Sequence, residues 1–133
     1  MQLIGGAGID SEDFGLIAGA AADGTLFTAS PDPRNSPAGA AVLAAFRATG
    51  YEPFGPAPFQ AYGAVQVWAQ AVEKAGTLEL HAVIDSLRSH EFDTIYGAIG
   101  FDEKGDVIGY ETFVWYIWQG GKYAPVDPDE LTE

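Results

Sequence analysis

The stretch Phe92–Trp118 reads FDTIYGAIGFDEKGDVIGYETFVWYIW, which has the character of a strand, a tight turn and a second strand. Its first part is rich in the β-branched and aromatic residues that suit a half-buried pleated surface. The turn is supplied by Asp102–Asp106, which contains a glycine able to adopt positive φ. Val107–Trp118 is the most apolar run of the chain and is too short to span a membrane as a helix. We therefore predict one strand near 94–100 and a second along the apolar run, buried on both faces.

The remaining segments supply helices that could cover such strands, and together they predict an α/β fold. Ser36 and Pro37 form a helix start, with a capping hydroxyl followed by proline at the first helical position. Apolar residues at helical spacing and terminal glycines mark the others. The expected helices lie near 36–49, 59–75 and 78–89, with a short one after Ser11, and further strands lie at Leu3–Ile4, near 24–30 and at Tyr123–Val126.

The composition excludes several classes of function. The chain has 133 residues, enough for one domain with a core, and 47% of them are hydrophobic. Six basic residues face nineteen acidic ones, a net charge of −13, which disfavours nucleic acid and anionic lipid as partners. There is no cysteine, so disulfides and thiolate metal sites are excluded. We recognise no signal peptide at the N-terminus and no segment long enough for direct membrane insertion.

Three groups of polar residues contain residue types found in reactive sites, but none of the groups is a complete site. They are His81 with Asp85, then Ser86, Ser89, His90 and Asp93, and finally Asp102, Lys104 and Asp106. Two ligands four residues apart are not a metal site, no nucleophile elbow frames a serine, and the later ligands of a calcium loop are missing. We therefore expect no catalytic residues, no metal, no cofactor and no enzyme activity.

The glycine-rich segment Gly5-Gly6-Ala7-Gly8 lies between a short apolar end and a helix start. Glycines before a helix can expose backbone N–H groups that bind anions. They can equally do no more than shape a turn, and short glycine motifs match often by chance. The residues alone favour the turn and leave the binding role open.

Three pieces of the chain resemble the branched-chain amino acid (Leu/Ile/Val) substrate-binding proteins of ABC importers, which have the periplasmic binding protein type I fold. Ala61–Gln66 is similar to a helix opening of that family. Phe92–Gly97 followed by Phe101–Asp106 resembles its strand and turn, and Val107–Gly120 resembles its final strand. The resemblance extends to about Val126 and covers the C-terminal third of such a receptor.

The resemblance implies a partial type I fold made of pieces of both lobes, and a non-catalytic receptor function. Residues 1–24 would belong to the second lobe, 31–106 to the first, and 107–126 to a crossing and a return strand, within a unit spanning 1–126. Residues 127–133 would form an acidic tail. The implied partners are a small-molecule solute and an ABC permease, and the implied location is periplasmic or extracellular. A stand-alone interaction or regulatory domain derived from this fold is the alternative.

The resemblance also places the ligand at Gly6, Ala7, Gly8 and Ile9. In the amino acid receptors the position matching Ala7 carries a glutamate that pairs with the ligand ammonium. Because a buried ammonium needs a carboxylate, the ligand here is expected to be a small amino acid or, given Ala7, a non-amino organic solute that is uncharged or purely anionic. The N–H groups of Gly8 and Ile9 would serve as donors.

A last expectation concerns self-association. A strand as apolar as Val107–Trp118 is stable only when covered, and in a full receptor its flanking segments lie largely outside this chain. Leaving Phe113, Trp115 and Ile117 in water would cost several kcal/mol, at roughly 1.5–3 kcal/mol for each. We therefore expect association with a second copy or with a complementary first-lobe segment.

Overall fold

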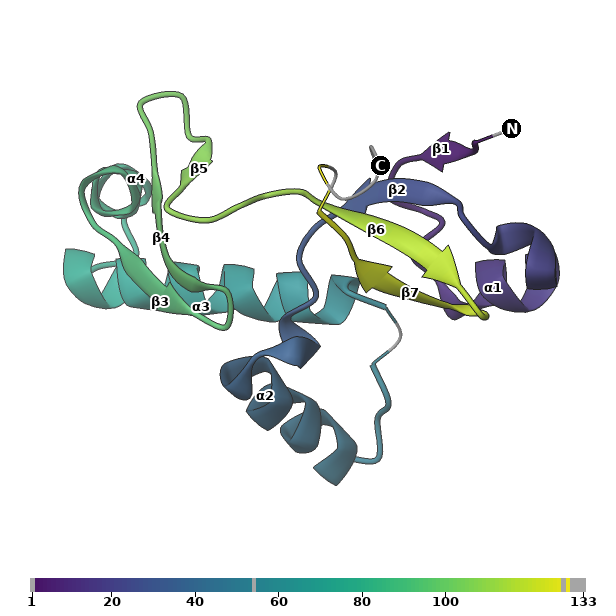
Figure 1. Cartoon of the computed structure of the whole chain (residues 1–133). Coiled ribbons are helices and arrows are strands. Elements are labelled where there is room, and N and C mark those ends of the chain that lie inside the picture. The colour runs from purple at the N-terminus through teal and green to yellow at the C-terminus, as the bar shows by residue number, and fades with distance from the viewer. Residues whose placement is uncertain (1, 54, 128, 130–133) are drawn as a thin grey trace. The chain divides into compact units, whose positions relative to one another are not determined.

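The computed structural model describes residues 2–53, 55–127 and 129 and shows an α/β fold, as predicted (Figure 1). The chain divides into two compact units. Unit 1 consists of Met1–Pro31 together with Glu111–Glu133, and unit 2 is the continuous segment Asp32–Tyr110. Of the expected tail at 127–133, only residues 127 and 129 are described.

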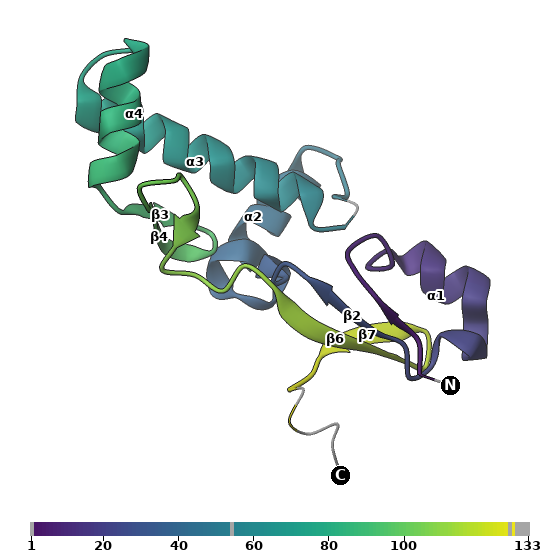
Figure 2. The same ribbon diagram turned by 90° about the horizontal axis from the view of Figure 1, so that it is seen from above.

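Unit 1 is a four-stranded sheet with a short helix. Its elements are β1 (Ile4–Gly5), α1 (Glu12–Ala18), a 3-10 turn η1 (Gly19–Ala22), β2 (Leu26–Ala29), β6 (Val114–Gln119) and β7 (Lys122–Pro125). The strand order is β1-β2-β6-β7. β1 runs parallel to β2, and the other neighbours are antiparallel (Figure 2). The strand β6 therefore lies inside the sheet, with a hydrogen-bonded neighbour on each side.

Aromatic side chains form the core of unit 1. Phe27 on β2 and both Tyr116 and Trp118 on β6 are buried, and Phe27 stacks on Tyr116 with ring centroids 5.3 Å apart. Alternate residues of β2 are buried because successive side chains of a strand point to opposite faces. Tyr123 from β7 meets the Phe27, Tyr116 and Trp118 rings edge-on. The chain's two ends thus share one core.

Unit 2 packs three helices with a small antiparallel sheet. Its elements are a 3-10 turn η2 (Pro33–Asn35), α2 (Pro37–Ala48), α3 (Ala57–Ala75), α4 (Leu80–Ser89), β3 (Phe92–Thr94), β4 (Gly97–Phe101) and β5 (Val107–Ile108). The sheet order is β3-β4-β5. Val67 and Ala71 of α3, Val83 of α4 and Phe92 of β3 form its buried cluster. The helix α3 is held to the hairpin because Gln70 exchanges two side-chain hydrogen bonds with the Asp93 backbone, at 2.8 and 3.1 Å.

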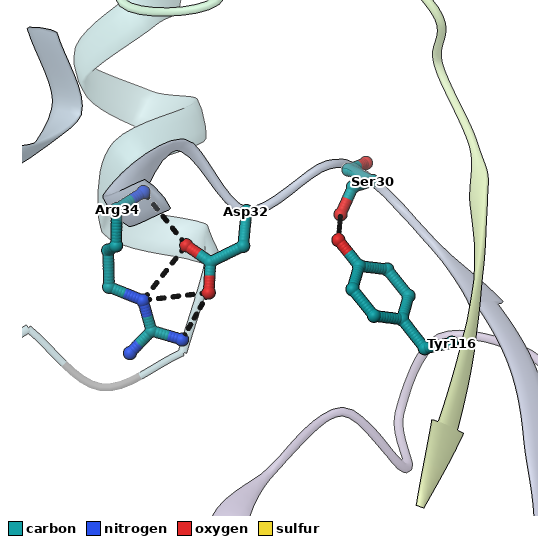
Figure 3. Close-up of polar contacts among 4 residues, drawn as sticks. All are labelled: Ser30, Asp32, Arg34 and Tyr116. Atoms are coloured by element: carbon teal, nitrogen blue, oxygen red, sulfur yellow. Dashed lines mark hydrogen bonds and ion pairs between the residues drawn. The ribbon is translucent and has the colours of Figure 1, made fainter. Parts of the chain in front are cut away.

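The helix starts and stops follow the capping residues of the sequence. The Ser36 hydroxyl accepts a hydrogen bond from the Gly39 N–H at 3.0 Å, with Pro37 at the first helical position, as predicted. Gly76 ends α3 in the left-handed conformation. Just before the start of α2, the Asp32 carboxylate accepts a hydrogen bond from the Arg34 backbone N–H. The same carboxylate forms an ion pair with the Arg34 guanidinium at 2.6 Å (Figure 3).

The prediction of one long strand over Val107–Trp118 is wrong. The segment forms β5 and β6, which belong to different sheets and different units. The strand is interrupted at Gly109, whose φ of +87° departs from extended backbone. β6 is also not buried on both faces, since its residues alternate between buried and half-buried. The expected strand near 94–100 is likewise a hairpin, with β3 and β4 joined by a tight turn at Ile95-Tyr96.

This split changes the strand on which the expected self-association rested. Trp115 and Ile117 lie in the inner strand β6 and are half-buried. Phe113 is 62% exposed but precedes the strand. Both edges of β6 are therefore paired within unit 1, and self-association stays a prediction.

Candidate functional site

The candidate ligand-binding loop, Gly6–Ile9, joins the end of β1 to the start of α1 in unit 1. Because β1 is parallel to β2, the loop leaves the carboxyl end of a parallel strand, which is where open α/β sheets place their ligands. Gly6, Ala7 and Gly8 are exposed, and Ile9 is half-buried against the aromatic core. The loop is thus open to solvent at one end and anchored at the other.

An indole provides the anchor. The Nε1–H of Trp118 donates to the Ile9 carbonyl at 3.0 Å, across a sequence separation of 109 residues. Gly5 and the Ile9 side chain also lie close together, since a Cβ added to Gly5 would lie 2.9 Å from Ile9 Cδ1. No local sequence pattern could have revealed this bond, because it joins residues far apart in the chain.

One of the two backbone donors expected to bind a ligand, the Gly8 N–H, already has a hydrogen-bond partner. Gly8 has φ +118°, and its N–H donates to Asp10 Oδ1 at 3.2 Å. A solute that used the Gly8 N–H would first have to displace this carboxylate. The N-cap position of α1 is occupied by Ser11, the residue after Asp10.

Three acidic residues follow Ile9 closely in the sequence. Asp10 is half-buried beside it, and Glu12 and Asp13 occupy the first turn of α1. Repulsion between these carboxylates and an anion disfavours an anionic group at the loop, which argues against the purely anionic end of the expected ligand range. An uncharged group meets no such cost. The exposed Ala7 brings no carboxylate of its own.

The polar groups singled out in unit 2 prove to be local structure. The Asp102 carboxylate accepts from the Lys104 and Asp106 backbone N–H groups at 2.9 and 2.8 Å, which confirms the turn interpretation. His90 Nδ1 lies 3.0 Å from the Ser86 carbonyl at the end of α4. Over the part of the chain that the structure describes, no cluster of three or more histidine, aspartate or glutamate side chains could hold a metal. None of the described helices combines the length and apolarity that a membrane crossing needs.

Unit 2 contains an apolar groove of about 420 Å³. The groove is lined by residues of α3, α4 and the β3-β4-β5 sheet. They are Gln60, Gly63, Ala64, Val67, Trp68, Leu87, Thr94, Tyr96, Ile99, Phe101, Val107 and Tyr110. Among the described residues, the buried Tyr96 hydroxyl has no hydrogen-bond partner. Burial raises the Tyr96 pKa well above its ordinary value, with smaller contributions from Tyr110 and Asp32.

This raised Tyr96 pKa predicts an alkaline loss of stability in unit 2. Above the ordinary tyrosine pKa of about 10, the unfolded chain releases the proton while the folded chain retains it, so the free energy of unfolding falls as pH rises. Tyr96→Phe should reduce this fall. It should change stability by less than about 1 kcal/mol at pH 7, because the hydroxyl has no partner to lose.

Urea unfolding at pH 7 and near pH 11 provides the measurement, with Tyr62→Phe as the control at an exposed tyrosine. Equal pH dependence in wild type and Tyr96→Phe would contradict the prediction.

Comparison with known proteins gives a consistent result. The sequence profile of a family described as periplasmic binding protein matches residues 1–119. The chain is 40% identical over 125 residues to "Leu/Ile/Val-binding protein homolog 1" of Brucella suis biovar 1, covering 92% of this chain and 33% of that protein. It is 36% identical over 117 residues to the leucine-, isoleucine-, valine-, threonine-, and alanine-binding protein of Pseudomonas aeruginosa, covering 88% of this chain and 31% of that protein.

Among solved structures, the leucine binding protein LivK of Thermotoga maritima MSB8 superposes with a TM-score of 0.73 at 26% identity. The match covers 97% of this chain and 38% of that protein. The chain thus spans about a third of the length of the curated relatives it matches.

Proposed function

Because the chain belongs to the periplasmic binding protein family, we propose that it forms part of the solute receptor of an ABC importer. Its role is to hold a small molecule at the Gly6–Ile9 loop and to present it to a permease, without catalysis. The family relation supports a periplasmic location for this activity. The observation that carries the proposal is the open loop at the carboxyl end of β1, anchored by the Trp118–Ile9 hydrogen bond.

The side chains around the loop suggest which end of a solute it accepts. A ligand ammonium would need a carboxylate, and Ala7 supplies none while Asp10 is engaged by the Gly8 N–H. A carboxylate at the loop would meet Asp10, Glu12 and Asp13. We therefore expect a small organic solute whose loop-facing end is uncharged.

Two solutes that differ only in the amino group test this proposal. A chimera in which this chain replaces the matching part of the Pseudomonas aeruginosa relative should bind 4-methylpentanoate at least as tightly as leucine. Ala7→Glu in the chimera should raise leucine affinity about tenfold to a hundredfold, since a hydrogen bond to a charged group contributes about 1.5–3 kcal/mol. Isothermal titration calorimetry measures both affinities. Ala7→Gln, similar in size but neutral, should leave leucine affinity unchanged.

Two results would overturn parts of the proposal. Leucine binding at micromolar or tighter affinity by the wild-type chimera would reject the uncharged-end solute. If Asp10→Asn then abolished that binding, Asp10 would be the group that replaces the family glutamate. A folded chimera that binds no small solute of either kind would reject the receptor role and favour a stand-alone interaction domain.

A further inference from the structure

Asp23-Gly24 is the only Asp-Gly pair of the sequence, and it lies between η1 and β2 in unit 1. An aspartate followed by glycine is the dipeptide at which a protein backbone most readily reacts with a neighbouring side chain. The reason is that glycine has no Cβ to shield its nitrogen from the carboxyl carbon of the aspartate. Asp23 is exposed and Gly24 is half-buried, so water reaches the pair.

In the folded chain, the two groups that would react are held by partners from the other end of the sequence. The Gly24 N–H donates to the Trp118 carbonyl at 2.9 Å. The Asp23 carboxylate accepts from the Gly120 N–H at 2.8 Å, across a separation of 97 residues. The following residue, Thr25, is 2% exposed, and its carbonyl accepts from the Trp118 N–H at 3.0 Å. The nitrogen and the carboxyl group are thus held by separate partners, and their reaction requires both hydrogen bonds to break.

We propose that Asp23-Gly24 is a self-modification site, which is protected while unit 1 is closed and reacts when unit 1 opens. In the open chain the Gly24 nitrogen attacks the Asp23 carboxyl carbon. The new C–N bond replaces the bond to the carboxyl hydroxyl, which leaves as water with the amide proton, and the product is a cyclic succinimide. A second water molecule then opens the ring. Opening at the side-chain carbonyl restores aspartate, whereas opening at the main-chain carbonyl leaves an isoaspartyl linkage.

The isoaspartyl product cannot rebuild the closed arrangement. Its main chain runs through Cβ, so an extra methylene separates residue 23 from Gly24, and the free carboxylate now lies on Cα. The strand β2 starts at Leu26, which pairs with Ile117 of β6. The added length prevents the Gly24 and Asp23 hydrogen bonds to the β6–β7 hairpin from forming together with this register. Opening of unit 1 therefore becomes irreversible in the modified molecules, and unit 2, which does not contain the pair, is unaffected.

The rates of isoaspartate formation in the folded and the unfolded chain test the proposal, which needs no solute and is independent of the proposed function. The chain is incubated at neutral pH with and without guanidinium chloride sufficient to unfold it. An isoaspartyl methyltransferase with a radiolabelled methyl donor measures the modified fraction, and peptide mapping by mass spectrometry locates it. The unfolded chain should be modified at least about tenfold faster, because the rate follows the population of the open state. Equal rates would overturn the proposal.

Asp23→Glu is the chemical control. Glutamate keeps the carboxylate, but its longer side chain would have to close a larger ring, which forms far more slowly. Most of the methyl label should therefore disappear from the unfolded Asp23→Glu chain. Label that persists at the wild-type level would show that another aspartate reacts, and would overturn the assignment to Asp23.

Two further variants locate the protection without denaturant. Trp118→Ala opens the core of unit 1 and should accelerate the modification, and Trp118→Phe, which keeps much of the ring packing, should give an intermediate rate. Gly39→Ala lies in α2 of unit 2 and should leave the rate at the wild-type value. A wild-type rate in Trp118→Ala, or equal acceleration by Gly39→Ala, would overturn the conclusion that closure of unit 1 protects the site.

Discussion

Replacing Trp118 by alanine is expected to remove about 3–5 kcal/mol from the free energy of unfolding, the range found when a buried tryptophan is truncated. The side chain is 1% exposed and its ring lies 5.2 Å from Tyr123 and 5.4 Å from Phe14, measured between centroids. The substitution also leaves the Ile9 carbonyl without its indole donor. Since a whole domain has a stability of about 5–15 kcal/mol, the loss should be severe.

Hydrogen exchange measured by mass spectrometry shows which part of the chain Trp118→Ala destabilises. Peptides from Met1–Pro31 should lose protection, because the core they form with β6 is opened. Phe113→Ala is the control, since Phe113 is large and apolar but 62% exposed, and it should shift stability by no more than about 0.5 kcal/mol. Equal losses in the two variants would show that Trp118 does not organise unit 1.

Trp118→Phe separates packing from hydrogen bonding at the same position. Phenylalanine keeps much of the ring contact but cannot donate to the Ile9 carbonyl. The cost should be smaller than that of alanine, and faster hydrogen exchange should be concentrated at residues 5–10. An unchanged exchange rate in that segment would mean that the indole bond does not hold the candidate ligand-binding loop.

Replacing Gly39 by alanine is expected to cost unit 2 about 2–4 kcal/mol, through overpacking and loss of the helix cap. A Cβ at this position would lie 1.8 Å from the Pro33 carbonyl oxygen and 2.4 Å from its carbon. These atoms belong to the backbone, and the same carbonyl accepts from the Ser36 hydroxyl and N–H at 2.9 Å. Relief of the overlap therefore requires the start of α2 to move. The gain in helix propensity, about 1 kcal/mol, is too small to offset this.

A second glycine in a helix of unit 2 serves as the matched control for Gly39→Ala. A Cβ on Gly63 in α3 would meet only the Tyr96 ring, at 3.2 Å, and a side chain can adjust where backbone cannot. Gly63→Ala should therefore change the free energy of unfolding by less than about 1 kcal/mol. Urea denaturation followed by circular dichroism measures both variants, and an equally small effect of Gly39→Ala would contradict the expectation.

The helices were predictable from sequence because their signals are local. The Ser36-Pro37 start and the Gly76 end each act within a few residues, and the structure confirms both. The prediction of one strand over Val107–Trp118 failed because it, too, used only local information. Apolar composition indicates that residues avoid water, but it does not indicate which sheet they join. The chain turns at Gly109, where the backbone approaches the Ala98 carbonyl so closely that an added Cβ would lie 3.1 Å from its oxygen.

The candidate ligand-binding loop was only partly predictable. The glycines marked a turn between a strand and a helix, and the structure confirms that geometry. The Trp118 anchor depends on a residue far away in sequence, so no periodicity could show it. The contact between Asp10 and Gly8 is local, but it depends on the backbone conformation at Gly8, which the residue types do not fix.

The division of unit 1 between the two ends of the chain has a consequence for the order in which the protein forms during synthesis. Unit 2 is continuous, so all of its pairing partners have been translated once Tyr110 leaves the ribosome. Unit 1 must wait, because contacts such as Tyr116 to Ser30 join residues 86 positions apart (Figure 3). Long-range pairing of this kind is slow, and β2 has no β6 to pair with until then. Aromatic residues at the start of the chain therefore remain exposed longest, and chaperones should meet the nascent chain there.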